Sequence, residues 1–303
     1  MSLRNRQIRF TELCAGFLHE KSDPLIASAP IRPDLFQNLR VAVMLYMSRF
    51  LPGMPAILNE GEILSEFVRR RREIQNVSPN GMLIPKNHAI LQFNAVVQAY
   101  MDIIKKLHIE KFISSWHIPL NVRFKDSDVV EGNLERSHPT EEIHSDSWAG
   151  ESAQSVTTMI PLLGDVQRNR VDYYIPPPDF EETWLGHLEH YRDGAEYAKR
   201  YTKIDVPFEK GSLNLVDFAT LHSSHRCPGA GPRVSIDTTF AMPAMGEKEV
   251  IHPWREDERM QNADLEEIGR RKLFVFPGNS NEWVDSRGGA KHPTNLLVRE
   301  LFQ

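Results

Sequence analysis

Alternation of apolar and polar residues constrains the fold of this chain most. From Trp116 onward, Ile118, Leu120, Val122 and Phe124 occupy every second position, which is the period of a half-buried strand. Further strands are predicted over residues 155–162, 170–175, 203–208, 212–218 and 233–240. Glycine and proline separate several of these segments. Many short strands joined by turns indicate an antiparallel sandwich or jelly roll.

The first third of the chain has a different period. Residues 35–50, 60–75 and 88–107 carry apolar side chains three and four positions apart, which is typical of amphipathic helices. Residues 179–201 predict a helical insertion between strands, and residues 257–272 predict a short charged helix. The expected fold is therefore mainly β with helices (α+β), with a jelly-roll core and N-terminal helices packed outside it.

One catalytic domain is expected over residues 1–303, a length that suits one large domain or two small ones. The sequence contains no repeat and no low-complexity tract, so a solenoid is unlikely. Within it we expect a mostly helical part over 1–115, the jelly-roll core with its helical insertion over 116–245, and a C-terminal extension over 246–303.

The charge balance excludes some classes of partner. The chain has 36 Lys and Arg against 41 Asp and Glu, a formal net charge of −5, which argues against a general nucleic-acid binder. Four consecutive arginines, 69–72, are interpreted as a solvated helix face. No apolar run long enough to span a membrane and no apolar signal segment is visible, so a cytoplasmic protein is expected. The pair Cys14 and Cys227 lacks the spacing of a structural zinc site.

The predicted core contains a candidate metal site. His144 and Asp146 are two residues apart, so in an extended chain both side chains leave the same face. His222 follows the apolar strand predicted over 212–218. Two imidazoles and one carboxylate leave coordination positions open, which suits non-haem Fe(II), whereas a closed structural zinc site needs a fourth ligand.

A second polar pair accompanies these ligands. Ten residues separate His222 from Arg233, and the Pro/Gly-rich stretch between them predicts a turn back into a neighbouring strand. Arg233 and Ser235 share one face of that strand. A guanidinium beside a hydroxyl suits the far carboxylate of a dicarboxylic acid.

Other polar residues near these motifs are candidates to contact substrate. They are Asn121, Arg123, Trp148, Glu151, His225 and Arg226. Trp148 has packing in the core as its alternative, and His225 competes with His222 as the third ligand or is a loop histidine. His187 and His190 could chelate a metal if they lie three apart on a helix, although a solvated helix face is favoured for them.

The combined motif resembles that of the Fe(II)/2-oxoglutarate-dependent dioxygenases, in particular the phytanoyl-CoA-hydroxylase-like and clavaminate-synthase-like branches. The resemblance rests on His144-x-Asp146, and on His222 followed after ten residues by Arg233-x-Ser235. It implies a double-stranded β-helix core in which His144, Asp146 and His222 are the catalytic iron ligands. Arg233 and Ser235 would anchor 2-oxoglutarate, and the spacing to Arg233 favours His222 over His225.

The same resemblance implies the reaction class. Such an enzyme decarboxylates 2-oxoglutarate to succinate and uses dioxygen to hydroxylate, or oxidatively cyclise, a polar small molecule in a biosynthetic pathway. The carboxylate of Asp146 disfavours halogenation, because related halogenases bind chloride at that position. The expected partners are a small-molecule substrate and dioxygen, with an oligomer left open.

Two other functions remain compatible with the predicted fold. One is a non-catalytic jelly-roll or cupin-like binding module, and the other is a metal-dependent enzyme that does not use 2-oxoglutarate. Arg233 discriminates against the metal-dependent enzyme, which has no reason to place a guanidinium there. Anaerobic addition of Fe(II) and 2-oxoglutarate would separate all three hypotheses.

Overall fold

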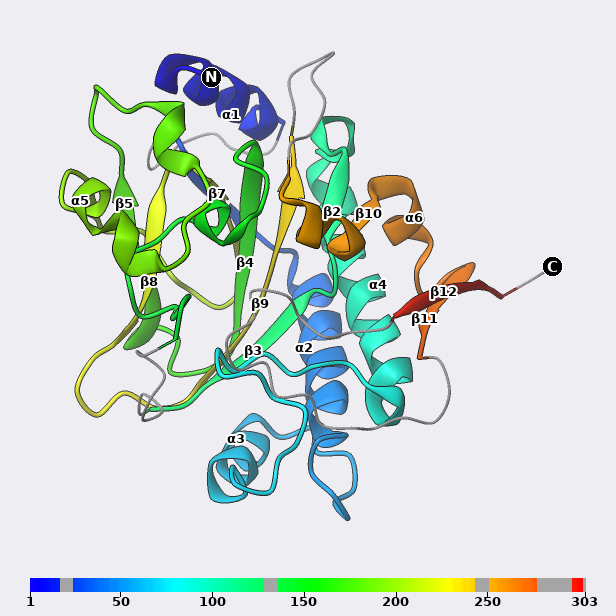
Figure 1. Cartoon of the computed structure of the whole chain (residues 1–303). Coiled ribbons are helices and arrows are strands. Elements are labelled where there is room, and N and C mark those ends of the chain that lie inside the picture. The colour runs from blue at the N-terminus through cyan, green and yellow to red at the C-terminus, as the bar shows by residue number, and fades with distance from the viewer. Residues whose placement is uncertain (17–23, 128–135, 243–250, 277–295, 302–303) are drawn as a thin grey trace.

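A computed structural model describes residues 1–16, 24–127, 136–242, 251–276 and 296–301 (Figure 1). Its helices are α1 (Leu3–Cys14), α2 (Pro33–Ser48), α3 (Glu60–Arg69), α4 (Ile90–Leu107), α5 (Ala195–Ala198) and α6 (Asn262–Glu267). Its strands are β1 (Ile26–Pro30), β2 (Ser115–His117), β3 (Asn121–Lys125), β4 (Ser155–Gly164), β5 (Asn169–Ile175), β6 (Thr202–Ile204), β7 (Ser212–Asp217), β8 (Leu221–Arg226), β9 (Arg233–Ala241), β10 (Arg259–Gln261), β11 (Lys272–Val275) and β12 (Leu297–Glu300). Within these ranges, no helix combines the length and apolarity needed to cross a membrane.

Two antiparallel sheets form the core. The larger has the strand order β1-β7-β4-β9-β2-β10, with β3 also paired to β9. The smaller has the order β6-β5-β8 and lies across from it (Figure 1). Apolar side chains such as Met159 of β4, Val216 of β7 and Val171 of β5 pack between the two sheets. The predicted α+β fold with a jelly-roll core and N-terminal helices is therefore confirmed.

The two faces of the large sheet have different environments. On β9, Val234, Ile236 and Phe240 join the main apolar core together with residues of α2 and α4. The alternate residues Arg233 and Asp237 of the same strand face a cavity instead. Strict alternation along β9 thus buries one face against helices and places charged groups between the sheets.

The structure differs from the predicted elements over residues 179–201, 257–272 and 203–208. Residues 179–201 form two 3-10 turns, Glu182–Leu185 and Tyr191–Gly194, followed by the short α5, not one long insertion helix. Backbone groups there bond to the neighbouring loop: the Leu188 N–H donates to the Trp148 carbonyl at 2.9 Å. The expected helix 257–272 is divided among a 3-10 turn, β10, α6 and the start of β11. The strand predicted over 203–208 is reduced to β6.

The first helix was not predicted, and a buried arginine fixes it to the core. Arg6 of α1 is 2% exposed and donates to the Asp217 carboxylate at 2.8 Å. It also pairs with Glu182 at 2.6 Å and donates to the Ala153 carbonyl at 2.6 Å. The guanidinium thus joins α1 to the end of β7 and to the 3-10 turn that begins at Glu182.

We expect Arg6→Ala to lower the free energy of unfolding by about 3–5 kcal/mol, because Asp217 would remain buried without its cation. Urea unfolding followed by circular dichroism measures this loss. The exposed neighbour on α1, Arg4, serves as the control, and Arg4→Ala should change stability by less than about 0.5 kcal/mol. Equal losses for both variants would contradict the role given to Arg6.

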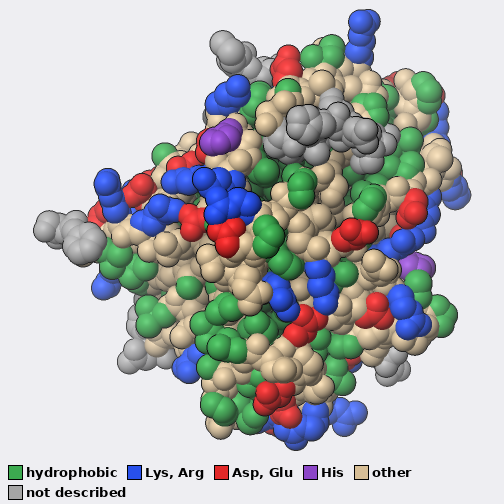
Figure 2. Space-filling view, turned by 180° about the vertical axis from the view of Figure 1, so that it is seen from behind, with side chains coloured by type: hydrophobic (Ala, Val, Ile, Leu, Met, Phe, Trp, Pro, Cys, Tyr) green, Lys and Arg blue, Asp and Glu red, His purple; other side chains and the backbone are tan. Residues whose placement is uncertain are grey.

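Arginines at the end of α3 are paired with acids. Arg69 pairs with Glu66 at 2.5 Å, Arg70 with Glu73 at 2.8 Å and Arg71 with Asp126 at 2.6 Å. Figure 2 shows that basic and acidic side chains also lie next to one another on the face turned away from the view of Figure 1. The interpretation as one solvated helix face is only partly right, because α3 ends at Arg69 and because Arg70 and Arg71 are half-buried.

Candidate functional site

The structure brings His144, Asp146 and His222 together. His144 and His222 form an isolated antiparallel bridge, in which the His144 N–H donates to the His222 carbonyl at 3.0 Å and the reverse bond measures 2.8 Å. Asp146 begins a 3-10 turn, Asp146–Ala149, after the extended Ser145. One bridge and one turn therefore place the three side chains at the same point.

The three side chains have the spacing of a metal site. One ligand atom from each lies within 4.8 Å of the others. Nε2 of His144 is 3.7 Å from one Asp146 oxygen, and Nε2 of His222 is 3.9 Å from the other. The His144 Nδ1 lies 2.7 Å from the Glu142 carbonyl, which fixes the ring with its proton on Nδ1. Its buried Nε2 has no hydrogen-bond partner among the described residues, so its lone pair is left for a metal ion.

The environment of His144 keeps the imidazole neutral. Burial lowers its pKa well below the usual value, and the nearby His222 lowers it further. Tyr191 stacks on the ring with centroids 4.0 Å apart. A neutral imidazole in a fixed orientation is the form that coordinates a cation.

A cavity connects this triad to Arg233. We call it the inner cavity; it encloses about 540 Å³ of atom-free space, including solvent at its mouth. It is lined by Arg123, Lys125, Thr140, His144, Asp146, Thr157, Met159, Val171, Tyr173, Val216, His222, Ser224, Arg233 and Asp237. The triad and the guanidinium predicted from the sequence thus face one common space.

Arg233 is buried although its side chain is a cation. Its side chain is 1% exposed, and Nε and Nη1 have no hydrogen-bond partner in the part of the chain that the structure describes. The hydroxyl of Ser235, also buried, has none in the same ranges. Burial and the nearby Arg226 lower the pKa of Arg233 to about 10, which still leaves it charged at neutral pH. Donors left open in this way fit an anionic ligand that supplies the missing acceptors.

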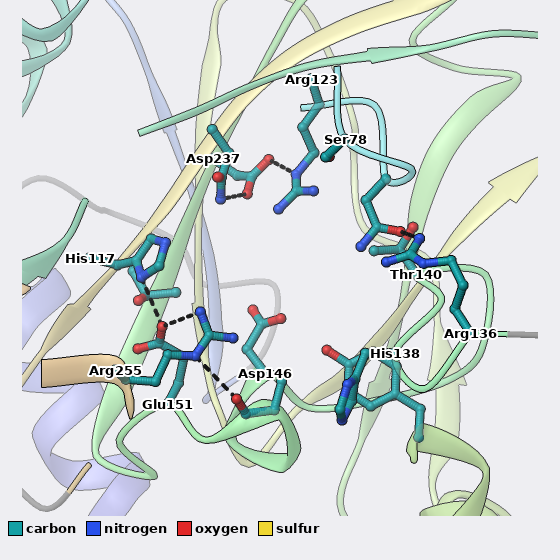
Figure 3. Close-up of a pocket in the computed structure, with 15 residues that line it drawn as sticks. Ser78, His117, Arg123, Arg136, His138, Thr140, Asp146, Glu151, Asp237 and Arg255 are labelled. Atoms are coloured by element: carbon teal, nitrogen blue, oxygen red, sulfur yellow. Dashed lines mark hydrogen bonds and ion pairs between the residues drawn. The ribbon is translucent and has the colours of Figure 1, made fainter. Parts of the chain in front are cut away.

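A second space, the polar chamber, adjoins the inner cavity (Figure 3). It shares Arg123, Thr140, Asp146 and Asp237 with the inner cavity. Its other lining residues are Ser78, Asn80, His117, Asn121, Arg136, His138, Ala149, Glu151, Tyr191, Thr239 and Arg255. Asp146 therefore faces both spaces, with the polar chamber on one side and Arg233 on the other.

Two candidate substrate residues share a carboxylate in the wall of the polar chamber. Asp237 accepts from Arg123 Nε at 2.7 Å and from Asn121 Nδ2 at 2.9 Å (Figure 3). The Arg123 Nη1 is buried and has no hydrogen-bond partner among the residues described. Arg123 can therefore donate to a ligand while Asp237 holds it in place.

Glu151 belongs to a buried cluster that the sequence did not reveal as a unit. Its carboxylate lies 2.8 Å from His117 Nδ1 and 3.3 Å from Arg259 Nη1, and Arg255 bonds the neighbouring Glu258 at 2.6 Å. His117, Glu151 and Glu258 have the spacing of a metal site, but two arginines already balance the two carboxylates. The cluster is therefore a rigid ion-pair network that forms part of the chamber wall (Figure 3).

The structure places three of the candidate substrate residues away from both spaces. Trp148 packs in an aromatic cluster and donates from Nε1 to the Trp184 carbonyl at 2.7 Å, which agrees with its packing alternative. His225 is half-buried and lies 3.5 Å from Asp172. Arg226 donates to Glu141 at 3.2 Å and lines a separate pocket beside α3.

The remaining histidine pair does not form a chelating site on a helix. His187 lies outside any helix, and its Nδ1 is 2.8 Å from the Trp148 carbonyl. His190 precedes the 3-10 turn Tyr191–Gly194 and faces Asp193 at 3.5 Å. Local contacts thus explain both rings.

Comparison with known proteins gave matches among solved structures. No protein-family model and no curated protein matches the sequence. The non-heme alpha ketoglutarate dependent epimerase SnoN from nogalamycin biosynthesis is 11% identical, with 97% of this chain and 99% of that chain covered and a TM-score of 0.38. EctD from S. alaskensis, solved with 2-oxoglutarate and 5-hydroxyectoine, is 14% identical, with 80% and 76% covered and a TM-score of 0.42.

An N-substituted L-amino acid dioxygenase from Burkholderia ambifaria AMMD is 10% identical to this chain. The match covers 79% of this chain and 89% of that one, with a TM-score of 0.38. SnoN is alpha ketoglutarate dependent and the EctD structure contains 2-oxoglutarate, which is the co-substrate of the class that the sequence motif resembles.

Proposed function

We propose that this protein is an Fe(II)- and 2-oxoglutarate-dependent oxygenase of the hydroxylase type that oxidises a polar small molecule. The observation that carries the proposal is one cavity with an open metal triad at one side and the buried Arg233 at the other, whose Nε and Nη1 have no hydrogen-bond partner among the described residues. A metal ion alone would not require a buried cation without acceptors, whereas a dicarboxylate bound beside the metal would.

The residues divide into two binding tasks. His144, Asp146 and His222 would hold Fe(II), which in this role supplies the activation of dioxygen. Arg233 and Ser235 would receive the distal carboxylate of 2-oxoglutarate, which would give partners to Arg233 Nε and Nη1 and to the Ser235 hydroxyl, atoms without one among the described residues. Tyr191 and the Glu142 carbonyl would hold the His144 ring in its ligating orientation.

The polar chamber is the candidate substrate site. Arg123, Asn121 and Glu151 lie in its wall, and the shared lining residue Asp146 brings the chamber next to the metal triad. Most of the lining side chains are polar or charged, so a hydrophilic substrate would find hydrogen-bond partners there. Hydroxylation and oxidative cyclisation both need the reacting carbon to be held close to the metal.

The experiment that tests the proposal is detection of succinate by NMR after incubation with Fe(II), 2-oxoglutarate and air. We expect succinate to form slowly without a substrate, and to require both iron and dioxygen. A metal-dependent enzyme of another class, or a binding module, would leave 2-oxoglutarate unchanged. Absence of succinate from the iron-loaded protein would contradict the proposal.

A further inference from the structure

Building on the proposed function, we propose that Lys125 is a second anchor for 2-oxoglutarate beside Arg233, and that it takes up a proton as the co-substrate binds. The inference starts from the register of β3 and β9. Lys125 stands directly opposite Arg233, and Arg123 stands opposite Ser235. Directly opposite residues project to the same face of an antiparallel pair, with their Cβ atoms about 5 Å apart.

The side chain of Lys125 occupies the wall of the inner cavity. It is 3% exposed and lines this cavity together with Arg233. Its Nζ donates to the Thr140 hydroxyl at 2.6 Å and lies 3.6 Å from a Glu141 oxygen. The same Glu141 oxygen lies 3.2 Å from Arg226 Nη1, so one carboxylate oxygen serves two cations.

The charges around the inner cavity favour a dianion. Three basic side chains line it: the guanidiniums of Arg123 and Arg233, and the amine of Lys125. Of the two carboxylates in its lining, Asp237 is bonded to Arg123 and Asp146 belongs to the metal triad. The end of the cavity beside Arg233 therefore has an excess of positive charge, which a dicarboxylate would neutralise.

The same surroundings make the charge of Lys125 adjustable. Burial lowers its pKa to about 7, and the guanidinium groups of Arg123, Arg226 and Arg233 also lower it, while Glu141 raises it. Asp126, the residue that follows β3, is paired with Arg71, which lies just after α3. At neutral pH the amine is thus poised between its neutral and charged forms.

A carboxylate placed beside Lys125 would raise its pKa, since it stabilises the charged form. Below pH 7 the lysine is already protonated and the dianion binds without proton uptake. Above pH 7 each binding event must bring a proton, so the affinity should fall with rising pH, by up to about tenfold per unit. The pH dependence therefore reports on Lys125 directly.

Isothermal titration calorimetry of 2-oxoglutarate into the Mn(II)-loaded protein tests this inference without turnover. Titrations at pH 6.5 and 8.5, in buffers of different ionisation enthalpy, give both the affinity and the protons taken up. We expect the wild type to bind more tightly at pH 6.5 and to take up protons at pH 8.5. Lys125→Met should bind about tenfold more weakly at pH 6.5 and should lose the proton uptake.

Two further variants sharpen the test. Lys125→Arg keeps the charge at all these pH values, so it should retain affinity and lose the pH dependence. This variant also decides the question if Lys125→Met does not fold. The control Lys199→Met changes an exposed lysine paired with Glu196, and it should behave like the wild type.

The outcomes separate the two proposals. If the wild type does not bind 2-oxoglutarate in the presence of metal, the proposed function fails, and the inference fails with it. If the wild type binds it, but Lys125→Arg shows the same proton uptake as the wild type, only the role of Lys125 is overturned.

Discussion

Replacing Asp146 by alanine is expected to abolish formation of succinate from 2-oxoglutarate and to weaken Fe(II) binding by about 100-fold or more. The carboxylate is the only anionic group of the triad, and its oxygens lie 3.7 and 3.9 Å from the Nε2 atoms of His144 and His222. Loss of residues that merely orient metal ligands costs about 10–100-fold in affinity, so loss of a ligand should cost at least as much.

Metal binding to Asp146→Ala can be measured by competition with a chromophoric chelator, and succinate by NMR. Asp205→Ala provides a matched control, because the Asp205 side chain is 90% exposed and lies outside the lining of the inner cavity. The control should bind metal like the wild type. If Asp146→Ala also retained wild-type metal affinity, the triad would be misassigned.

Replacing Arg233 by methionine is expected to weaken the binding of 2-oxoglutarate without lowering the stability of the ligand-free protein. The affinity for 2-oxoglutarate should fall by about 30-fold to several thousand-fold, because removing one partner of a buried charge pair costs about 2–5 kcal/mol. Stability of the ligand-free protein should stay the same or rise, since Arg233 is buried with Nε and Nη1 lacking partners in the described ranges. An apolar side chain of similar length removes this desolvated charge.

The Arg233→Met prediction needs two measurements on the same variant. Calorimetry gives the affinity for 2-oxoglutarate, and thermal unfolding gives the stability, while metal binding should be unchanged because the guanidinium is not a ligand. A large fall in stability with unaltered affinity would mean that Arg233 is a structural cation.

The jelly-roll core could be predicted because apolar and polar residues alternate along strands such as β9. One face of such a strand packs against helices, and the other face lines a cavity. Along β9, Val234, Ile236 and Phe240 pack in the core with α2 and α4, while Arg233 and Asp237 on the other face line the inner cavity. The sequence of β8, Leu221–Arg226, has no such alternation, since polar residues lie on both of its faces and β5 supplies its pairing. Strand β1 is short and finds its place only through pairing with β7.

The predicted insertion helix failed for a tertiary reason. Trp184, Leu188 and Tyr191 have a helical spacing, but they pack with Trp148 in one cluster of mostly aromatic residues. Backbone bonds to the loop that carries Trp148 replace those of a continuous helix. Propensity and period do not reveal such competing contacts.

Part of the candidate site was visible in the sequence and part was not. His144 and Asp146 are two positions apart, and so are Arg233 and Ser235. The local geometry of the chain is therefore enough to predict that the two members of each pair lie close together. Lys125 faces Arg233 only through the register of β3 and β9. The cluster that includes His117 and Arg255 joins segments far apart in the chain, so no local pattern marks it.

The most direct test of the whole account is an anaerobic titration of the protein with Fe(II) and 2-oxoglutarate, followed by visible absorption. We predict a charge-transfer band that appears only when both are present and that is lost in Asp146→Ala. A wild-type protein that stays colourless at saturating iron and 2-oxoglutarate would contradict the claim that one cavity binds both.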